Sequence, residues 1–143
     1  MLKLSETLKE LITESKTDYK TFAKQVGISP SRITDYINND KLPTVENLIK
    51  IADYFDCSCN YLLGRDYEER RSDFNTPIPF AERLAYLKEL LGFTHKQIYE
   101  SEGISKSRYF DWLNGRRQPS LDNIIKLADL FECSVDFVLG RED

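Results

Sequence analysis

One short basic stretch contains the side chains whose types and spacing are best suited to chemistry. Residues 103–119 read GISKSRYFDWLNGRRQP and combine one lysine and three arginines with serine and asparagine side chains. Cations and hydrogen-bond donors at this density are suited to holding a polyanion through charge-assisted hydrogen bonds. The chain of 143 residues nevertheless has a formal net charge of −4. Binding of a polyanion would therefore rest on a local patch and not on the overall charge.

Cysteine and histidine side chains do not complete a metal site in this sequence. Cys57 and Cys59 form a C-x-C pair, but Cys133 and the one histidine, His95, lie far away along the chain. A structural zinc site needs four ligands, so we expect no bound metal. An odd number of cysteines without an export signal also argues against a disulfide framework. We expect these cysteines to behave as small, buried apolar side chains.

The sequence offers no set of catalytic groups. A nucleophile, a base and oxyanion donors must meet in one site, and this chain has a single histidine and no glycine-rich phosphate loop. We expect neither an enzyme nor a cofactor or small-molecule ligand. No apolar run approaches the roughly 20 residues of a membrane span, and the amino terminus, MLKLSETLKELITESK, lacks the apolar core of a secretion signal. A cytoplasmic location is the resulting expectation.

The basic stretch has a copy earlier in the chain. Residues 27–43, GISPSRITDYINNDKLP, align with residues 103–119 without a gap at a shift of 76 positions. The same shift aligns residues 4–67 with residues 80–143, and about a third of the pairs are identical. A match of this length indicates a duplicated structural unit. Each unit has about 64 residues, a size at which a small helical domain can fold alone.

A linker separates the two units. Residues 67–79, YEERRSDFNTPIP, lose the helical spacing and contain two prolines. We therefore predict a first domain over residues 1–66, a linker over residues 67–79 and a second domain over residues 80–143. Four apolar side chains suggest that the linker is partly docked: Tyr67, Phe74, Ile78 and Phe80.

Helical spacing runs through both units, and no segment alternates like a strand. Each unit begins with an apolar stripe, formed by Leu4, Leu8, Leu11 and Ile12 in one and by Phe80, Leu84, Leu87, Leu90 and Leu91 in the other. Predicted N-caps precede the next three helices, namely Asp18 or Thr94, Ser29 or Ser105, and Thr44 or Ser120. A short fifth helix ends at Gly64 or Gly140. The pattern predicts an all-α fold with five helices in each unit.

The second and third predicted helices are separated only by Gly-Ile-Ser, the tight spacing of a helix-turn-helix. The second unit continues with NGRRQPS and LADLFECSVDFVLG, and the first with NNDKLPT and IADYFDCSCNYLLG. In these motifs both units resemble the Cro and phage-repressor type (xenobiotic-response-element) helix-turn-helix family, over all but the linker and the extreme ends. The resemblance implies two tandem five-helix, lambda-repressor-like DNA-binding domains. It also places Cys57, Cys59 and Cys133 at core positions.

Both units depart from the family pattern at the second helix. Tyr19 and His95 stand where a glutamine commonly holds a phosphate, and both can still donate a hydrogen bond. Tyr99 replaces the small alanine kept as Ala23, and Glu102 replaces an apolar residue. In the second unit, these changes leave undetermined how the second and third helices cross.

The turn after the third helix differs between the units. The glycine usual in the family is present as Gly115, whereas Asn39 stands there in the first unit. Because asparagine tolerates the left-handed backbone, we expect Asn39 to adopt the same conformation as Gly115.

The resemblance implies that the third helix of each unit reads bases in a major groove with its exposed amino-terminal face. Lysine can donate to guanine, serine can read several base edges, and aspartate can accept from cytosine N4. Arg32 with Asp35 and Arg108 with Asp111 repeat one i, i+3 pair, in which the arginine orients the aspartate, reaches a phosphate, or only forms a surface ion pair. The candidate base-reading residues are Pro30, Ser31, Arg32, Thr34, Asp35, Lys106, Ser107, Arg108, Phe110 and Asp111.

Phosphate contacts are expected from the helix starts and from the loop after the third helix. The candidates are Tyr19, Lys20, Asn38, Lys41, His95, Lys96, Asn114, Arg116 and Arg117. Neither unit is basic overall, so acidic residues such as Asp129, Glu132, Asp136 and Glu142 would face away from DNA. A rival explanation of the net charge is that one unit has lost its ligand. The first unit is the better candidate, because it has Pro30 and Asp40 where the second has Lys106 and Arg116.

The expected partner is double-stranded DNA. Two reading helices commonly meet successive major grooves about 34 Å apart, and a linker of about 13 residues could reach about 43 Å. Since the units differ at base-facing positions, one chain would prefer an asymmetric pair of half-sites. A homodimer through the apolar carboxy-terminal helices stays open, as do the operator sequence and the contribution of each repeat.

The expected function is that of a sequence-specific DNA-binding transcriptional regulator, and a repressor is the form we favour over an activator. A protein-interaction module is the alternative, in which one or both helix-turn-helix units dock a protein partner. Replacing Arg116 and Arg117 by glutamate separates the two, since DNA binding should fail while docking through another face should persist.

Overall fold

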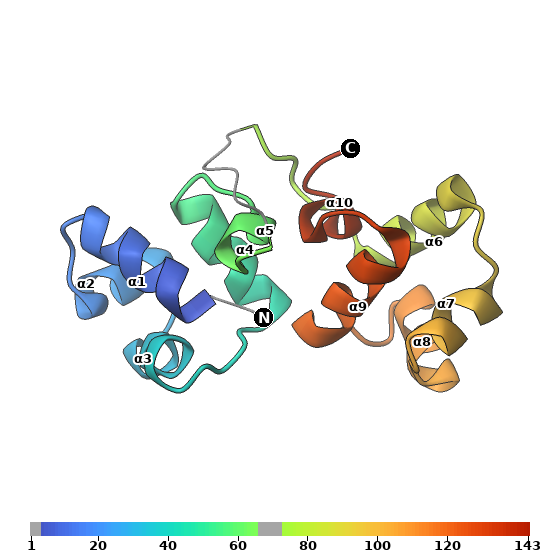
Figure 1. Ribbon diagram of the computed structural model, residues 1–143, viewed down its shortest axis with the longest axis horizontal. Helices are drawn as coiled ribbons and strands as arrows, with labels where there is room; N and C mark the ends of the chain where they lie inside the picture. The colour runs from blue at the N-terminus through green and yellow to red at the C-terminus, as the bar shows by residue number, and fades with distance from the viewer. Residues whose placement is uncertain (1–3, 66–72) are drawn as a thin grey trace. The chain divides into compact units, whose positions relative to one another are not determined.

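The structure is a computed structural model that describes residues 4–65 and 73–143. These residues form ten helices joined by turns, without a strand among them (Figure 1). They divide into two compact units at the bond between Asp73 and Phe74. The predicted all-α fold with five helices in each of two tandem units is therefore confirmed.

The first unit contains α1 (Leu4–Glu14), α2 (Tyr19–Val26), α3 (Pro30–Asn38), α4 (Val45–Tyr54) and α5 (Cys59–Leu62). Helix α1 packs against α3 and α5, while α2 packs against α3 and α4. Fully buried apolar side chains fill the space between these helices, among them Leu8, Phe22, Ile33, Leu48, Ile51 and Leu62. Cys57 and Cys59 are buried in the same core, as expected.

The second unit contains α6 (Phe80–Leu91), α7 (His95–Ser101), α8 (Lys106–Leu113), α9 (Leu121–Phe131) and α10 (Val135–Leu139). It repeats the packing of the first unit, with α6 against α8 and α10 and with α7 against α8 and α9. Its core is formed by side chains such as Leu84, Leu87, Ile98, Tyr109, Trp112 and Leu127. Cys133 is only half-buried, so the expected core position holds fully for two of the three cysteines.

Side-chain caps begin the motif helices at the predicted residues. The Ser29 hydroxyl accepts from the backbone N–H of Arg32, and the Ser105 hydroxyl accepts from that of Arg108, both at 3.4 Å. Thr94 forms a capping box with Gln97 at the start of α7. Because these side chains satisfy N–H groups that the helix itself leaves without partners, the caps define where the helices start.

Asp18 caps α2 in the same way. Its carboxylate accepts from the backbone N–H of Thr21 at 2.7 Å. This hydrogen bond to the charged form is the main reason that the pKa of Asp18 lies below its usual value.

The apolar stripe of α6 differs from the prediction at one residue. Leu90 is 53 % exposed, and Tyr86 beside it on the same face is 50 % exposed. At about 100° per residue, Leu90 lies about 90° around the helix from the stripe that includes Leu84 and Leu87. The prediction that Leu90 faces the core is therefore wrong, because its position around the helix takes it off the buried side.

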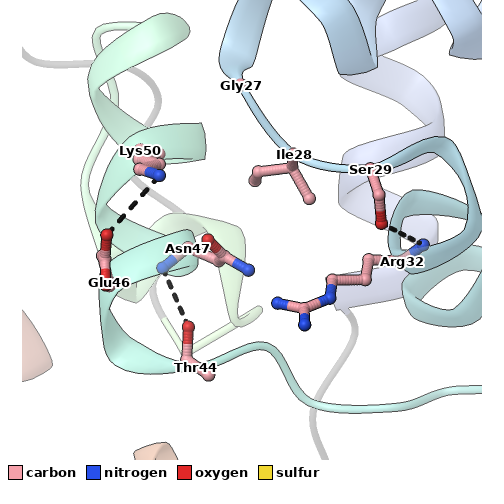
Figure 2. Close-up of a pocket in the computed structure, with 8 residues that line it drawn as sticks. All are labelled: Gly27, Ile28, Ser29, Arg32, Thr44, Glu46, Asn47 and Lys50. Carbon is pink, nitrogen blue, oxygen red and sulfur yellow. Dashed lines mark hydrogen bonds and ion pairs between the residues drawn. The ribbon is translucent and has the colours of Figure 1, made fainter.

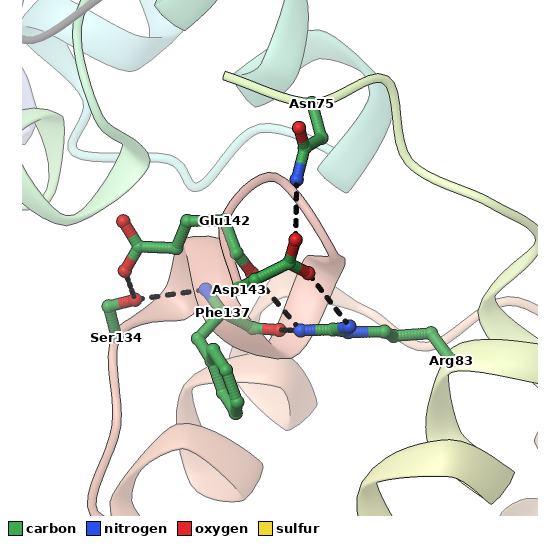
Figure 3. A network of polar contacts seen from close by, with 6 residues as sticks. All are labelled: Asn75, Arg83, Ser134, Phe137, Glu142 and Asp143. Carbon is green, nitrogen blue, oxygen red and sulfur yellow. Dashed lines mark hydrogen bonds and ion pairs between the residues drawn. The ribbon is translucent and has the colours of Figure 1, made fainter. Parts of the chain in front are cut away.

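A buried arginine ties α6 to the carboxyl end of the second unit (Figure 3). Arg83 donates to the carbonyl oxygen of Phe137 from Nε at 3.0 Å and from Nη2 at 2.6 Å. Its Nη2 also donates to the carbonyl oxygen of Glu142 at 3.2 Å, and Nη1 lies 3.9 Å from the Asp143 carboxylate. A planar guanidinium can meet several acceptors at once, so this side chain holds the residues after α10 against α6.

The segment before α6 is held by the same end of the unit. The backbone N–H of Asn75 donates to the carbonyl oxygen of Arg141 at 2.7 Å, and the Arg141 guanidinium lies 4.2 Å from the ring centroid of Phe74. Arg141 also pairs with the buried Asp136 at 2.6 Å. Phe74 thus packs on the second unit, whereas Tyr67, also expected to dock, lies outside the described residues.

Candidate nucleic-acid interface

The turn between the two motif helices depends on a left-handed glycine in each unit. Gly27 has φ 77° and Gly103 has φ 63°. No atom lies within 4 Å of where a Cβ would stand on either glycine, so the backbone conformation, and not space, favours glycine here. The amide N–H of Ile28 bonds back to α2, and that of Ile104 bonds back to α7, which closes the turn. Helices α3 and α8 therefore follow their partners after the same short turn.

Helices α3 and α8 each bury one face and expose another. Ile33 and Tyr36 hold α3 in the first core, while Tyr109 and Trp112 hold α8 in the second. The candidate base-reading residues lie on the remaining surface of these helices. Seven of them are exposed, namely Pro30, Ser31, Arg32, Thr34, Lys106, Ser107 and Arg108, and three are half-buried, namely Asp35, Phe110 and Asp111.

The candidate phosphate-binding residues flank these faces. They stand at the start of α2 and α7 and at the end of α3 and α8 or in the loop that follows. All of them are exposed except Tyr19, which is half-buried: Lys20, Asn38, Lys41, His95, Lys96, Asn114, Arg116 and Arg117. Within each unit, both sets of candidates therefore belong to the helix-turn-helix and the loop after it, and most of them are exposed.

The aspartates on the third helices pair with the loop and not with the neighbouring arginines. Asp35 lies 3.8 Å from Lys41, and Asp111 lies 3.9 Å from Arg116 and 3.5 Å from Arg117. The expected i, i+3 pairs are not among the ion pairs of the described residues, because the loop folds back over the end of the helix. The backbone N–H of Arg116 donates to the Asp111 carbonyl oxygen at 2.9 Å, which brings the cations to the carboxylate.

Arg32 points instead towards the start of α4. Figure 2 shows its side chain extending from α3 towards Asn47 and Thr44, across a hollow between the helix-turn-helix and α4. Ser29, Glu46 and Lys50 also line this hollow. Lys50 pairs with Glu46 at 3.5 Å, so part of its charge is balanced within the protein. An arginine beside a helix amino terminus is an arrangement suited to an anion.

Asn47 and Thr44 are residues that reasoning from the sequence did not select for this surface. The Thr44 hydroxyl accepts from the N–H of Asn47 at 3.1 Å, and the Asn47 amide donates to the Tyr36 hydroxyl at 3.0 Å. Asn47 thereby links the start of α4 to α3, the helix that carries the base-reading candidates. The predicted N-cap at Thr44 was the one signal in the sequence that pointed to this helix start.

The turns after α3 and α8 reverse the chain at different residues. Gly115 has φ 73°, whereas Asn39 has φ −116° and the next residue, Asp40, has φ 49°. The prediction that Asn39 is left-handed is therefore wrong. Its side-chain amide donates to the Asp35 carboxylate at 2.8 Å and its N–H donates to the Asp35 carbonyl oxygen. These bonds keep Asn39 on the end of the helix and move the reversal one residue along.

Aromatic side chains fill the helix-turn-helix of the second unit. The ring of Tyr99, which replaces the usual alanine, lies 5.8 Å from that of Tyr109 and 6.3 Å from that of Phe110. The Tyr109 hydroxyl and His95 Nδ1 are 2.8 Å apart. Burial raises the pKa of Tyr109 to about 12. The hydrogen bond to His95 thus involves a phenol that sits largely out of solvent.

Among the residues that the structure describes, His, Cys, Asp and Glu side chains do not gather in groups of three or more that could hold a metal ion. Across residues 4–65 and 73–143, no helix combines the length and apolarity needed to cross a membrane.

A protein-family model matches each unit separately, and single known proteins match less than half of the chain. A family model described as helix-turn-helix matches residues 8–62 and again residues 84–138. The chain is 36% identical over 64 residues to the uncharacterized HTH-type transcriptional regulator YobD of Bacillus subtilis. This match covers 45% of this chain and 57% of that protein.

Two further relatives show the same extent of similarity. The cryptic phage CTXphi transcriptional repressor RstR of Vibrio cholerae is 35% identical over 60 residues, 42% of this chain and 54% of that protein. The HTH-type transcriptional regulator AnsR of Bacillus subtilis is 38% identical over 61 residues, 43% of this chain and 53% of that protein. The chain thus spans little more than half the length of these relatives. No solved structure matches it significantly.

Proposed function

This chain belongs to the helix-turn-helix family, and from that premise we propose that it is a sequence-specific regulator of transcription that binds double-stranded DNA. The observation that carries the proposal is the repeated surface of α3 and α8, where exposed polar side chains lie between cationic residues at both ends of the motif. A helix presented in this way fits a major groove, with base edges in front of it and phosphates on either side.

In this arrangement the first turns of α3 and α8 meet the bases. Lys106 can donate to guanine, and Ser31 and Ser107 can read several base edges. Arg108 is also proposed to contact a base. The aspartates have a second function, because their carboxylates hold the cations of the following loop. When the loop meets the DNA backbone, these Lys and Arg side chains then pair with phosphates in place of the aspartates.

Arg32 is better suited to a phosphate than to a base in the proposed complex. Its side chain lies beside the amino terminus of α4 in the hollow of Figure 2, where the helix dipole adds positive potential and Glu46 offsets the charge of Lys50. A phosphate in this hollow would fix the register of α3, which is the usual effect of backbone contacts.

The second unit is proposed to bind DNA more tightly than the first. Lys106, Arg116 and Arg117 stand where the first unit has Pro30, Asp40 and Lys41. Each cation that neutralises a phosphate releases condensed counterions and increases affinity at low salt. The first unit would then contribute mainly to the sequence specificity and to the length of the DNA site.

Repression is the proposed outcome of binding. A protein that occupies an operator blocks access of other proteins to that DNA, and RstR, one of the relatives, is named a transcriptional repressor. Two domains over residues 1–66 and 80–143, joined by residues 67–79, would place two reading helices on one site. Neither catalysis nor a cofactor takes part in this function.

Selection of bound sequences from random duplex DNA by the full-length chain tests the proposal. We expect an asymmetric pair of half-sites, with binding that weakens steeply as salt rises. Arg117→Glu should reduce affinity more than Lys41→Glu, whereas Lys9→Glu makes the same change of charge on the exposed surface of α1 and should have little effect. If no duplex is bound in a salt-sensitive manner at micromolar protein, the proposal is wrong.

A further inference from the structure

One large apolar side chain stands among the polar residues of the α8 surface. Phe110 is half-buried and follows Lys106 by four residues and Ser107 by three, so helical spacing places all three on one face. The core of the unit is formed by the opposite face, where Tyr109 and Trp112 are buried. Phe110 is therefore an apolar group at the polar surface, and not a core residue.

Neighbouring rings hold Phe110 in place. Its ring centroid lies 5.4 Å from that of His95, 6.3 Å from that of Tyr99 and 5.3 Å from that of Tyr109. The first two come from α7 and the third from α8. A phenyl ring packed in this way loses little conformational freedom when it meets a ligand. The structure thus presents a preformed apolar contact between Lys106 and the phosphate-binding candidates.

Thr34 occupies the equivalent position of the first unit. It is exposed on α3, and its hydroxyl donates to the carbonyl oxygen of Pro30 at 3.0 Å. Because this hydrogen bond stays within the helix, the hydroxyl has its partner in place. The γ-methyl group is then the part of Thr34 best suited to an outside contact. Both third helices therefore carry an apolar group at the same position of the repeat.

We propose that Phe110 and Thr34 each contact the 5-methyl group of a thymine, so that both half-sites contain a thymine at the matching position. This inference rests on the proposed major-groove binding of α3 and α8. The thymine methyl is the apolar feature of the major-groove base edges, and apolar side chains such as phenylalanine and the threonine methyl suit it. A phenyl ring over a guanine or adenine edge would instead leave base acceptors without partners.

Single replacements of thymidine by deoxyuridine in a selected duplex test the inference with the full-length chain. Deoxyuridine pairs with adenine as thymidine does and lacks only the 5-methyl group. We expect affinity to fall about fourfold at one position in each half-site, the ratio that follows from losing the burial of about one methyl group. Replacements elsewhere in the duplex should change affinity much less.

Variants assign each position to its side chain. Phe110→Ala should abolish the difference between thymidine and deoxyuridine in the half-site of the second unit and leave that of the first intact. Thr34→Ser keeps the hydroxyl and loses the methyl, so it should abolish the difference in the other half-site. Thr34→Val keeps a methyl and loses the hydroxyl, so it should preserve the difference. The two Thr34 variants test the proposal even if Phe110→Ala folds poorly.

The outcomes separate this inference from the function on which it rests. A chain that binds no duplex overturns the proposed function and the thymine contacts together. A chain that binds its selected duplex equally well after every deoxyuridine replacement overturns the thymine contacts alone. Sensitivity to deoxyuridine that persists unchanged in both Phe110→Ala and Thr34→Ser also overturns them.

Discussion

The carboxylate of Asp111 lies 3.5 Å from Nε of Arg117, across the turn that follows α8. The Asp111 side chain is 27% exposed and that of Arg117 is 67% exposed, so the pair stands at the surface, where such pairs contribute about 0–1 kcal/mol to stability. Under the proposed function, its importance therefore concerns the charge that the loop would present to DNA. In the free protein the carboxylate offsets part of the positive charge of the two loop arginines.

Asp111→Asn is expected to increase affinity for duplex DNA of random sequence. The substitution leaves both arginines to the phosphates, and one additional neutralised phosphate steepens the plot of log affinity against log salt by about 0.9. Fluorescence anisotropy of a labelled duplex at several salt concentrations measures both effects. Asp35→Asn is the comparison in the first unit, where it frees one cation, Lys41, and also alters the hydrogen bond from Asn39. Weaker binding restricted to sites with a cytosine at one position would instead identify Asp111 as a base-reading residue.

Asp40→Gly is expected to stabilise the first unit by about 0.5–1 kcal/mol. Asp40 has φ 49°, and glycine adopts a left-handed backbone without the penalty that other residues incur there. Asn39→Gly is the control, and it should destabilise, because Asn39 has φ −116° and its side chain bonds to Asp35. Urea unfolding followed by circular dichroism measures both variants. The opposite order of stability would place the left-handed residue at Asn39.

Leu87→Ala and Leu90→Ala are expected to differ greatly in stability although both truncate a leucine of α6. Leu87 is fully buried, so its loss leaves a cavity and should cost about 2–5 kcal/mol. Leu90 is 53 % exposed, and its loss should change stability by less than about 0.5 kcal/mol. Trp112 is the single tryptophan of the chain and lies in the core of the second unit. Its fluorescence therefore reports this unit during urea unfolding, and similar costs for the two variants would contradict the exposed position of Leu90.

The second unit is expected to lose stability as the pH rises from about 10 to about 12. The pKa of Tyr109 is raised by burial from 10.0 to about 12, so the unfolded chain releases the phenol proton first. The stabilisation is complete below pH 10 and disappears as the pH passes the value of the folded state. Urea midpoints from Trp112 fluorescence at several pH values measure it. Tyr109→Phe lacks this proton and should lose stability less steeply over the same range, whereas an equally steep loss would exclude Tyr109 as the cause.

Much of the fold and of the candidate surface could be predicted from local patterns. The helix starts at Ser29, Ser105 and Thr94 follow from side chains that cap N–H groups three residues away. The left-handed turns at Gly27 and Gly103 follow from the backbone freedom of glycine. Since these rules act within a few residues, the repeat in the sequence became a repeat in structure. The exposed faces of α3 and α8 then followed from helical spacing.

Contacts between elements required the tertiary structure. Asp111 turned to the loop and not to Arg108, and Arg32 turned towards α4, although helical spacing allowed the i, i+3 pair in each case. The reason is that ion pairing and burial depend on the distance between a side chain and groups on other elements. Local sequence patterns do not give that distance. The sequence by itself therefore determined the duplicated helices and the residues that they expose. Packing decided which of those residues form ion pairs and hydrogen bonds with one another, because only the folded chain brings the partners close enough.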